Sequence, residues 1–264
     1  MIEKREYHRV GLHLHTLQSD GLHHVNEMLR QAGEAGLHLV VVTDHDEVFR
    51  GLEKQIRTGT TLLPGIEITT AQGHVVGTFP DIVPEEIPMG RSLSETVDMV
   101  RSYGGLVGIP HVGVGPSIAS VTPNTVRRLY ESGRYVDMIE VLHPAFRERH
   151  RQTADKLAEE LCIAPVGVDD DHEGNVGRRI VTLVPRSTGN PQLDLQTALR
   201  DRTTVAVRSD LPLIYPPRSV PQHVGALFVG FPKKVANGSA FLSTWTGLGR
   251  EELVRRLGDL HGGK

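Results

Sequence analysis

The chain has few residues of several kinds: one cysteine, one tryptophan and only 5% aromatic residues in a length of 264. The single Cys162 excludes an intramolecular disulfide and is typical of a reducing compartment. No stretch approaches the roughly 20 apolar residues of a membrane-spanning helix. The first ten residues, MIEKREYHRV, lack the apolar core of a signal peptide. We therefore expect a cytoplasmic protein that does not bind membranes.

Neither sign of charge is in large excess, because 29 basic and 32 acidic side chains give a formal net charge of −3. Binding of bulk nucleic acid or of an anionic membrane requires a basic surface, and the near-equal numbers of acidic and basic residues do not predict one. A basic patch on one part of the surface is still compatible with this composition. The length suits one large α/β domain better than two small ones. The chain is instead rich in histidine, with 14 residues.

Two segments near the N-terminus present histidine and aspartate side chains directly after apolar residues. His13 and His15 follow an apolar lead-in, and residues two apart in a strand point to the same side, roughly 6–7 Å from each other. The next turn presents Asp20, and an apolar strand predicted over residues 37–43 is followed by His45. Catalytic groups in α/β folds lie just past such strands, so this pattern predicts one site.

Predicted strands and helices alternate along most of the chain. Hydrophobic periodicity and capping residues predict helices over 25–35, 49–56, 93–100, from 123 onward, 146–161 and 192–200. Short apolar runs predict further strands over 61–68, 74–77, 106–110, 136–141, 163–168, 180–184 and 203–207. This order favours a parallel barrel or a doubly wound sheet.

The positions of the polar residues decide between these two architectures. They follow nearly every predicted strand and must meet at one point, which a closed barrel allows and an open sheet does not. Beyond Arg208 the alternation ends, and prolines at 212, 216, 217, 221 and 232 interrupt the chain. We expect residues 1–208 to form an α/β barrel that carries a metal site, and residues 209–264 to form a C-terminal extension packed on it.

Each motif also has a structural explanation when it is taken alone. Asp44 could hydrogen-bond the backbone of its own loop, and Gly65-Ile66-Glu67 could be a solvated strand end. His111 could be a core histidine with satisfied hydrogen bonds, and the three aspartates 169–171 could form an ordinary charged loop. However, a histidine or carboxylate residue follows nearly every predicted strand. This recurrence favours one shared metal site over separate structural explanations for each motif.

The motif series resembles that of the PHP family, which is named for its polymerase-associated and histidinol-phosphatase members. The motifs, in chain order, are His13-Leu14-His15-Thr16, Ser19-Asp20-Gly21, Thr43-Asp44-His45, Gly65-Ile66-Glu67, His74 before Val-Val-Gly, Pro110-His111 and Asp170-Asp171-His172. The resemblance covers about Val10 to His172. It implies a distorted (β/α)7 barrel with two or three divalent metal ions at its C-terminal mouth, and the hydrolysis of phosphoesters.

Carried over residue by residue, the resemblance also implies the metal ligands. The first metal would be held by His13, His15, Glu67 and Asp170. Glu67 would bridge to a second metal, which His74 and His111 also bind. A third metal would be held by Asp20, His45 and His172. Imidazole and carboxylate ligands together suit manganese, iron or zinc.

Four further residues are candidates for roles around these metals. His143 stands where the family usually has asparagine, in an E-V-Y-N-like stretch; it could support the ligands, contact substrate, or act as the catalytic acid that protonates the leaving group. Arg178 and Arg179 are predicted to bind the substrate phosphate, with a solvated loop as the alternative. Asp44 is expected to orient a ligand imidazole.

The leading functional hypothesis is a metal-dependent phosphoesterase. Its substrate would be a small phosphorylated metabolite or nucleotide, attacked by a hydroxide that bridges two metals. One alternative is an exonuclease-type phosphodiesterase that acts on nucleic-acid ends. The other is a non-catalytic, metal-stabilised binding domain, against which the presence of every ligand type argues.

Overall fold

The computed structural model describes residues 6–50 and 59–215, all within one compact unit that spans Met1–Pro217. Most of the helix expected over 49–56, and the extension from residue 216 onward, lie outside the described residues. Within the described ranges, no helix combines the length and the hydropathy needed to cross a membrane.

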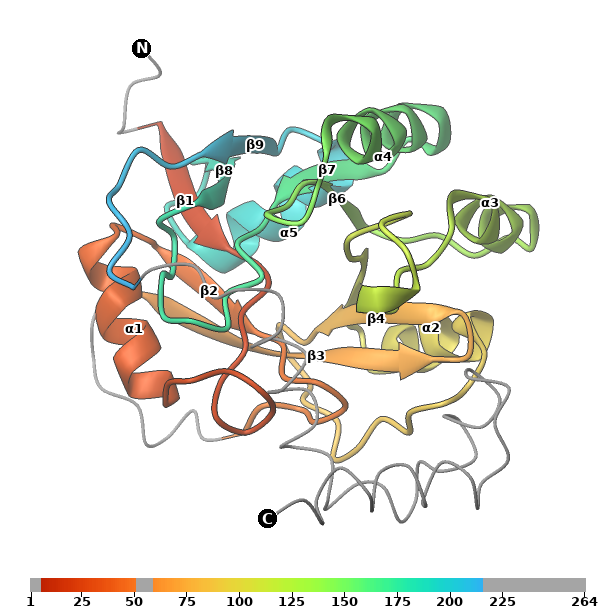
Figure 1. The fold of residues 1–264 in the computed structure, drawn as a ribbon, viewed down its shortest axis with the longest axis horizontal. Coiled ribbons are helices and arrows are strands. Elements are labelled where there is room, and N and C mark those ends of the chain that lie inside the picture. The colour runs from red at the N-terminus through yellow and green to blue at the C-terminus, as the bar shows by residue number, and fades with distance from the viewer. Residues whose placement is uncertain (1–5, 51–58, 216–264) are drawn as a thin grey trace, which may run out of the picture. The chain divides into compact units, whose positions relative to one another are not determined.

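One curved sheet forms the centre of this unit (Figure 1). Its described strands are β1 Tyr7–Gly11, β2 Leu39–Val42, β3 Thr61–Thr70, β4 Gly73–Thr78, β5 Leu106–Ile109, β6 Met138–Leu142, β7 Ala164–Gly167, β8 Ile180–Pro185 and β9 Val205–Arg208. They are arranged in the order β7-β6-β5-β4-β3-β2-β1-β8-β9. Side-chain bonds from Thr182 to Gly167 and from Thr204 to Pro165 join the two ends of the sheet. The expected α/β barrel, nearly closed, is therefore confirmed.

The strand directions differ in part from a purely parallel barrel. Seven strands run the same way, whereas β4 and β8 are antiparallel to both of their neighbours. Strands β3 and β4 are joined by the short turn at Ala71 and Gln72, and so tight a connection can link only antiparallel strands. Gly73, the first residue of β4, has φ +125°, and a Cβ there would lie 2.6 Å from the carbonyl oxygen of Ala119.

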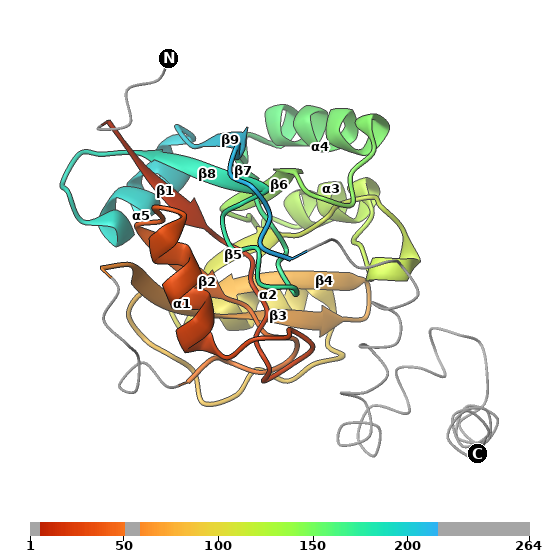
Figure 2. The ribbon, with the colours of Figure 1, turned by 60° about the vertical axis from the view of Figure 1, so that its left-hand side comes forward.

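In the described part of the chain, five α-helices lie outside the barrel: α1 Val25–Glu34, α2 Leu93–Ser102, α3 Pro123–Glu131, α4 Glu148–Leu161 and α5 Pro191–Asp201 (Figure 2). Ser92 caps α2, because its hydroxyl accepts the N–H of Glu95 while the Glu95 carboxylate accepts the N–H of Ser92. Thr122 caps α3, with Pro123 in the first turn as predicted.

Strand β2 shows why the apolar run after Gly36 has no polar alternation. Val40 and Val42 pack in one buried cluster with Leu29 of α1, while Leu39 and Val41 pack in another with residues of neighbouring strands. Both faces of this strand are therefore covered, as is usual for parallel strands in α/β proteins.

The chain continues past the strand ends in an extended form that holds the polar loops together. Strand β1 ends at Gly11, so His13 and His15 lie beyond it and not within it as expected. Leu14 forms an isolated bridge with Asp171, and His45 forms one with Glu67. These bridges join four segments of the candidate site that lie far apart in the sequence.

Candidate metal centre

All nine predicted ligands meet at one end of the barrel. The loop after β1 provides His13, His15 and Asp20, and the residues after β2 provide His45. Strands β3 and β4 provide Glu67 and His74 from within the sheet, the end of β5 is followed by His111, and the loop after β7 provides Asp170 and His172. The structure thus places these residues as the sequence pattern requires; that they bind metal stays a prediction.

Glu67 is the centre of this cluster and is 1% exposed. Its Oε1 lies 2.9 Å from Nδ1 of His74 and 3.0 Å from Nε2 of His111. Its Oε2 lies 3.1 Å from Nε2 of His13, 3.3 Å from Nε2 of His15 and 3.3 Å from Nδ1 of His45. One carboxylate therefore faces two groups of imidazoles, one on each oxygen, as the predicted bridging ligand must.

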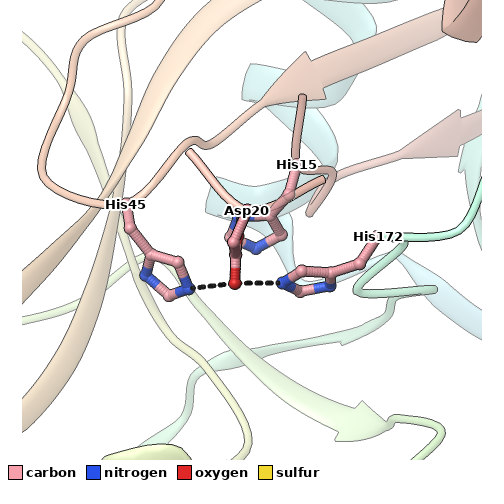
Figure 3. Close-up of side chains that lie close together, drawn as sticks. All are labelled: His15, Asp20, His45 and His172. Carbon is pink, nitrogen blue, oxygen red and sulfur yellow. Dashed lines mark ion pairs between the residues drawn. The ribbon is translucent and has the colours of Figure 1, made fainter. Parts of the chain in front are cut away.

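Two aspartates complete the polar cluster on its more open side. Asp20 lies between two imidazoles, with Oδ2 3.3 Å from His172 and 3.7 Å from His45 (Figure 3). Asp170 Oδ1 lies 3.2 Å from Nε2 of His15 and 3.4 Å from Nε2 of His13. The ring of His15 stacks on that of His172 with a centroid separation of 4.0 Å.

Three overlapping groups bring one atom from each member within 4.8 Å of one another. They are His15, Asp20, His45 and His172; His13, His15 and Glu67; and His45, Glu67 and His74. The first contains the whole predicted third site and adds His15. The second contains three of the four ligands predicted for the first metal. The third differs from the predicted second site by including His45, although His111 also contacts Glu67.

Glu140 is a site residue to which the sequence analysis assigned no role. Its buried carboxylate accepts a hydrogen bond from Nδ1 of His13 at 2.7 Å and another from the N–H of His111 at 2.7 Å. With Nδ1 of His13 held by Glu140, Nε2 faces the cluster and lies 3.1 Å from Oε2 of Glu67. The sequence does contain a signal for such a role, because Glu140 is the one charged residue in the otherwise apolar strand β6, Met138–Leu142.

His143 contacts a predicted ligand directly. Its Nδ1 accepts the N–H of Ala145 at 3.0 Å, so its Nε2 carries the proton and donates to Oδ2 of Asp170 at 3.1 Å. In this arrangement the imidazole supports the Asp170 carboxylate. A role in protonating a leaving group stays a prediction.

The expectation for Asp44 was wrong. Its carboxylate accepts hydrogen bonds from the N–H of Thr16 at 2.7 Å, the hydroxyl of Thr16 at 2.7 Å and the hydroxyl of Ser19 at 2.6 Å. These donors lie in the loop that carries Asp20, so Asp44 fixes this loop and not an imidazole. A short carboxylate side chain beside a tight loop readily satisfies the loop's own donors.

The two predicted phosphate-binding arginines already have partners in the protein. Nη1 of Arg178 donates to the carbonyl oxygen of Pro212 at 2.9 Å, and Nη2 lies 3.7 Å from Glu34 of α1. Arg179 forms an ion pair with the buried carboxylate of Glu173. Their assignment to substrate phosphate stays a prediction.

The electrostatics of the cluster favour positive charge next to its carboxylates. Burial lowers the pKa of His15, but hydrogen bonding to Asp170 and Glu67 and the charge of Asp20 outweigh burial and raise this pKa to about 10. Burial raises the pKa of Glu67, but the surrounding imidazoles hold it well below its usual range. Burial lowers the pKa of His45 to about 3, against the effect of Glu67. Protonated imidazoles thus balance the ionised carboxylates, and divalent cations bound to the same atoms would supply this positive charge instead.

The contacts of His15 support the same set of metal ligands. Its ring nitrogens are buried and lie 3.2 Å from Oδ1 of Asp170, 3.3 Å from Oε2 of Glu67 and 3.5 Å from Oδ1 of Asp20, but none of these contacts has good hydrogen-bond geometry. Bound cations would satisfy these buried polar atoms better. His111 and Asp170 also have positive φ values of 31° and 45°. Backbone strain of this kind is concentrated at functional sites.

No family model matches the chain. An uncharacterised protein of Methanocaldococcus jannaschii is 31% identical over 117 residues, which are 39% of this chain and 67% of that protein. Among solved structures, a two-domain Bacteroides vulgatus protein that contains a predicted PHP-like metal-dependent phosphoesterase superimposes with a TM-score of 0.58. The identity is 20%, with 85% of this chain and 70% of that chain covered.

The chain therefore has the fold of this PHP-like structure. This confirms the fold that the motif resemblance implies. The same PHP-like barrel matches the lesion-specific endonuclease PfuEndoQ of Pyrococcus furiosus, with a TM-score of 0.53 and 15% identity over 77% of this chain. This chain spans 57% of the length of that endonuclease.

Proposed function

We propose that this protein is a metal-dependent hydrolase of phosphoesters. The observation that carries the proposal is the contact of five imidazoles with the single buried carboxylate of Glu67, at the mouth of a PHP-like barrel. Such an arrangement suits a bridging ligand between two cations. A binding domain without turnover would have no need of so many ligands at a solvent-facing mouth.

The residues that would hold the cations are the nine predicted ligands, with manganese, iron or zinc as the metals. When bound, paired divalent cations polarise phosphoryl oxygens and lower the pKa of water from about 15.7 to about 7. The chain's own groups keep the ligands in place. Glu140 orients His13, His143 holds the carboxylate of Asp170, and Asp44 fixes the loop that carries Asp20.

The proposed substrate is a small phosphorylated metabolite or nucleotide. The net charge of −3 supports a small substrate over a long polyanion. Action on nucleic-acid ends is the second candidate, since the barrel also resembles that of an endonuclease.

The test combines metal analysis with a substrate panel. Protein prepared without chelator, and then reconstituted with manganese, iron or zinc, should contain at least two metal equivalents and hydrolyse at least one small phosphomonoester. Glu67→Gln should abolish turnover and lower metal content, whereas the matched exposed variant Glu131→Gln should change neither. Less than one equivalent after reconstitution would contradict the proposal. Hydrolysis confined to nucleic-acid ends would favour the second candidate.

A further inference from the structure

A pair of aromatic residues, Tyr215 and His23, lies beside the metal centre and has no role in the proposed metal binding or hydrolysis. The ring of Tyr215 stacks on that of His23, with a centroid separation of 5.1 Å and an interplanar angle of 28°. Tyr215 is nevertheless 37% exposed. The segment 209–215 that carries it runs along the loop between β7 and β8 in both ribbon views (Figures 1 and 2).

The backbone of Tyr215 is held from both sides by one buried side chain. Oδ1 of Asn175 accepts the N–H groups of Ile214 at 2.9 Å and Tyr215 at 3.0 Å, and Nδ2 donates to the carbonyl oxygen of Tyr215 at 3.0 Å. Asn175 is fully buried. The backbone of Tyr215 is therefore fixed in place while part of the residue stays exposed, and such preorganisation lowers the entropic cost of binding a ligand.

The same contacts fix Tyr215 relative to the predicted ligands. The carboxylate of Asp171, which lies between Asp170 and His172 in the chain, accepts the N–H groups of Gly174 and Asn175, both at 2.9 Å. A Cβ at Gly174 would lie 2.5 Å from the ring of His23 and 3.0 Å from that of Tyr215. The aromatic pair therefore packs directly on the loop that carries His172.

His23 is tied to the same loop by a second route. Nε2 of His23 lies 3.2 Å from the carbonyl oxygen of Glu173, and the neighbouring N–H of Leu22 donates to the carbonyl oxygen of His172 at 2.9 Å. Leu22 is 38% exposed, and His172 remains partly exposed. The exposed apolar surface of Leu22 and Tyr215 thus borders the solvent-facing side of the metal centre.

We propose that Tyr215, supported by His23 and Asn175, determines substrate specificity by stacking on a planar ring in the alcohol part of the phosphoester, for which a nucleobase is the fitting chemistry. This inference rests on the proposed function. An exposed, preorganised aromatic face next to a phosphoester-binding centre offers stacking and no charge, which suits a planar ring better than a polyhydroxyl sugar. Base–aromatic stacking contributes about 1–3 kcal/mol, enough to decide between two esters with the same leaving oxygen.

The experiment compares adenosine 5′-monophosphate with ribose 5-phosphate, because both lose the same primary alcohol and differ by the base. Tyr215→Ala should lower kcat/KM for the nucleotide by about 10-fold and leave that for ribose 5-phosphate unchanged. Tyr215→Phe, which keeps the ring, should behave as the wild type. The matched control is Tyr135→Ala, at an exposed tyrosine before β6. Calorimetric titration of the metal-free protein with adenosine should show binding that Tyr215→Ala weakens.

The outcomes separate this inference from the proposed function. Equal loss of activity on both esters in Tyr215→Ala, or a wild type that hydrolyses ribose 5-phosphate as well as the nucleotide, would overturn the role of Tyr215. Absence of adenosine binding would overturn it too. If neither ester is hydrolysed in the presence of metal, the proposed function loses support, while adenosine binding that depends on Tyr215 still upholds the stacking site.

Discussion

Glu140 and His13 form a buried pair in which the carboxylate lies 2.7 Å from Nδ1 of the imidazole. The other oxygen of Glu140 accepts the N–H of His111, so one side chain fixes two predicted ligands. Partners of this kind typically contribute 10- to 100-fold to metal affinity, as an order of magnitude.

The first prediction follows from this pair. Glu140→Gln should weaken metal binding by about 10- to 100-fold. The neutral amide oxygen of glutamine is a weaker acceptor than the glutamate carboxylate for the Nδ1–H of His13. Competition with a fluorescent chelator measures the effect. Glu160→Gln, an exposed position on α4, serves as control. Unchanged affinity in Glu140→Gln would show that His13 is oriented by other contacts.

The second prediction concerns Arg179, whose ion pair with the buried Glu173 changes the expected effect of its removal. Arg179→Ala should remove the cation that is paired with this buried carboxylate and lower the free energy of unfolding by about 3 kcal/mol. Urea unfolding of the metal-free protein measures this loss. Adding Glu173→Gln should restore much of the stability. A raised KM with unchanged stability would instead support binding of the substrate phosphate.

The third prediction is a pH dependence of stability at the N-terminal end of α5, where Asp194 lies. Burial raises the pKa of Asp194, but hydrogen bonds from Ser187 and Thr188 outweigh burial and hold this pKa below its usual value of 3.8. A lowered carboxyl pKa stabilises the fold above the unfolded pKa, and this contribution is lost as the pH falls through the folded pKa.

Asp194→Asn should therefore lower the free energy of unfolding at pH 7 by about 1–3 kcal/mol, since it leaves buried donors without an ionised acceptor. The difference from the wild type should shrink as the pH falls below about 4. Denaturant titrations at both pH values, in the presence of chelator, measure it. Asp201→Asn, exposed at the C-terminal end of the same helix, is the control. A difference that does not depend on pH would contradict the assignment.

The strand-end motifs predicted the barrel and the gathering of the nine polar residues because each follows a local apolar run. Long-range contacts leave no such periodic signal. The hydrogen bonds of Glu140 join residues 127 and 29 positions apart. The bonds of Asn175 to Ile214 and Tyr215 reach 39 and 40 positions along the chain, into a segment without helix or strand periodicity. The direction of β8 depends on its pairing with β1, which the sequence pattern does not encode.

The last prediction decides between two roles for His143. Its Nε2–H donates to Asp170, and its side chain is buried, so we expect it to support a ligand carboxylate. His143→Ala should then slow the hydrolysis of an alkyl phosphate and of p-nitrophenyl phosphate by the same factor and also weaken metal binding. A general acid would behave differently, because its contribution of about 10²- to 10⁴-fold matters most for a poor leaving group. Selective slowing of the alkyl phosphate, with metal affinity unchanged, would make His143 the catalytic acid.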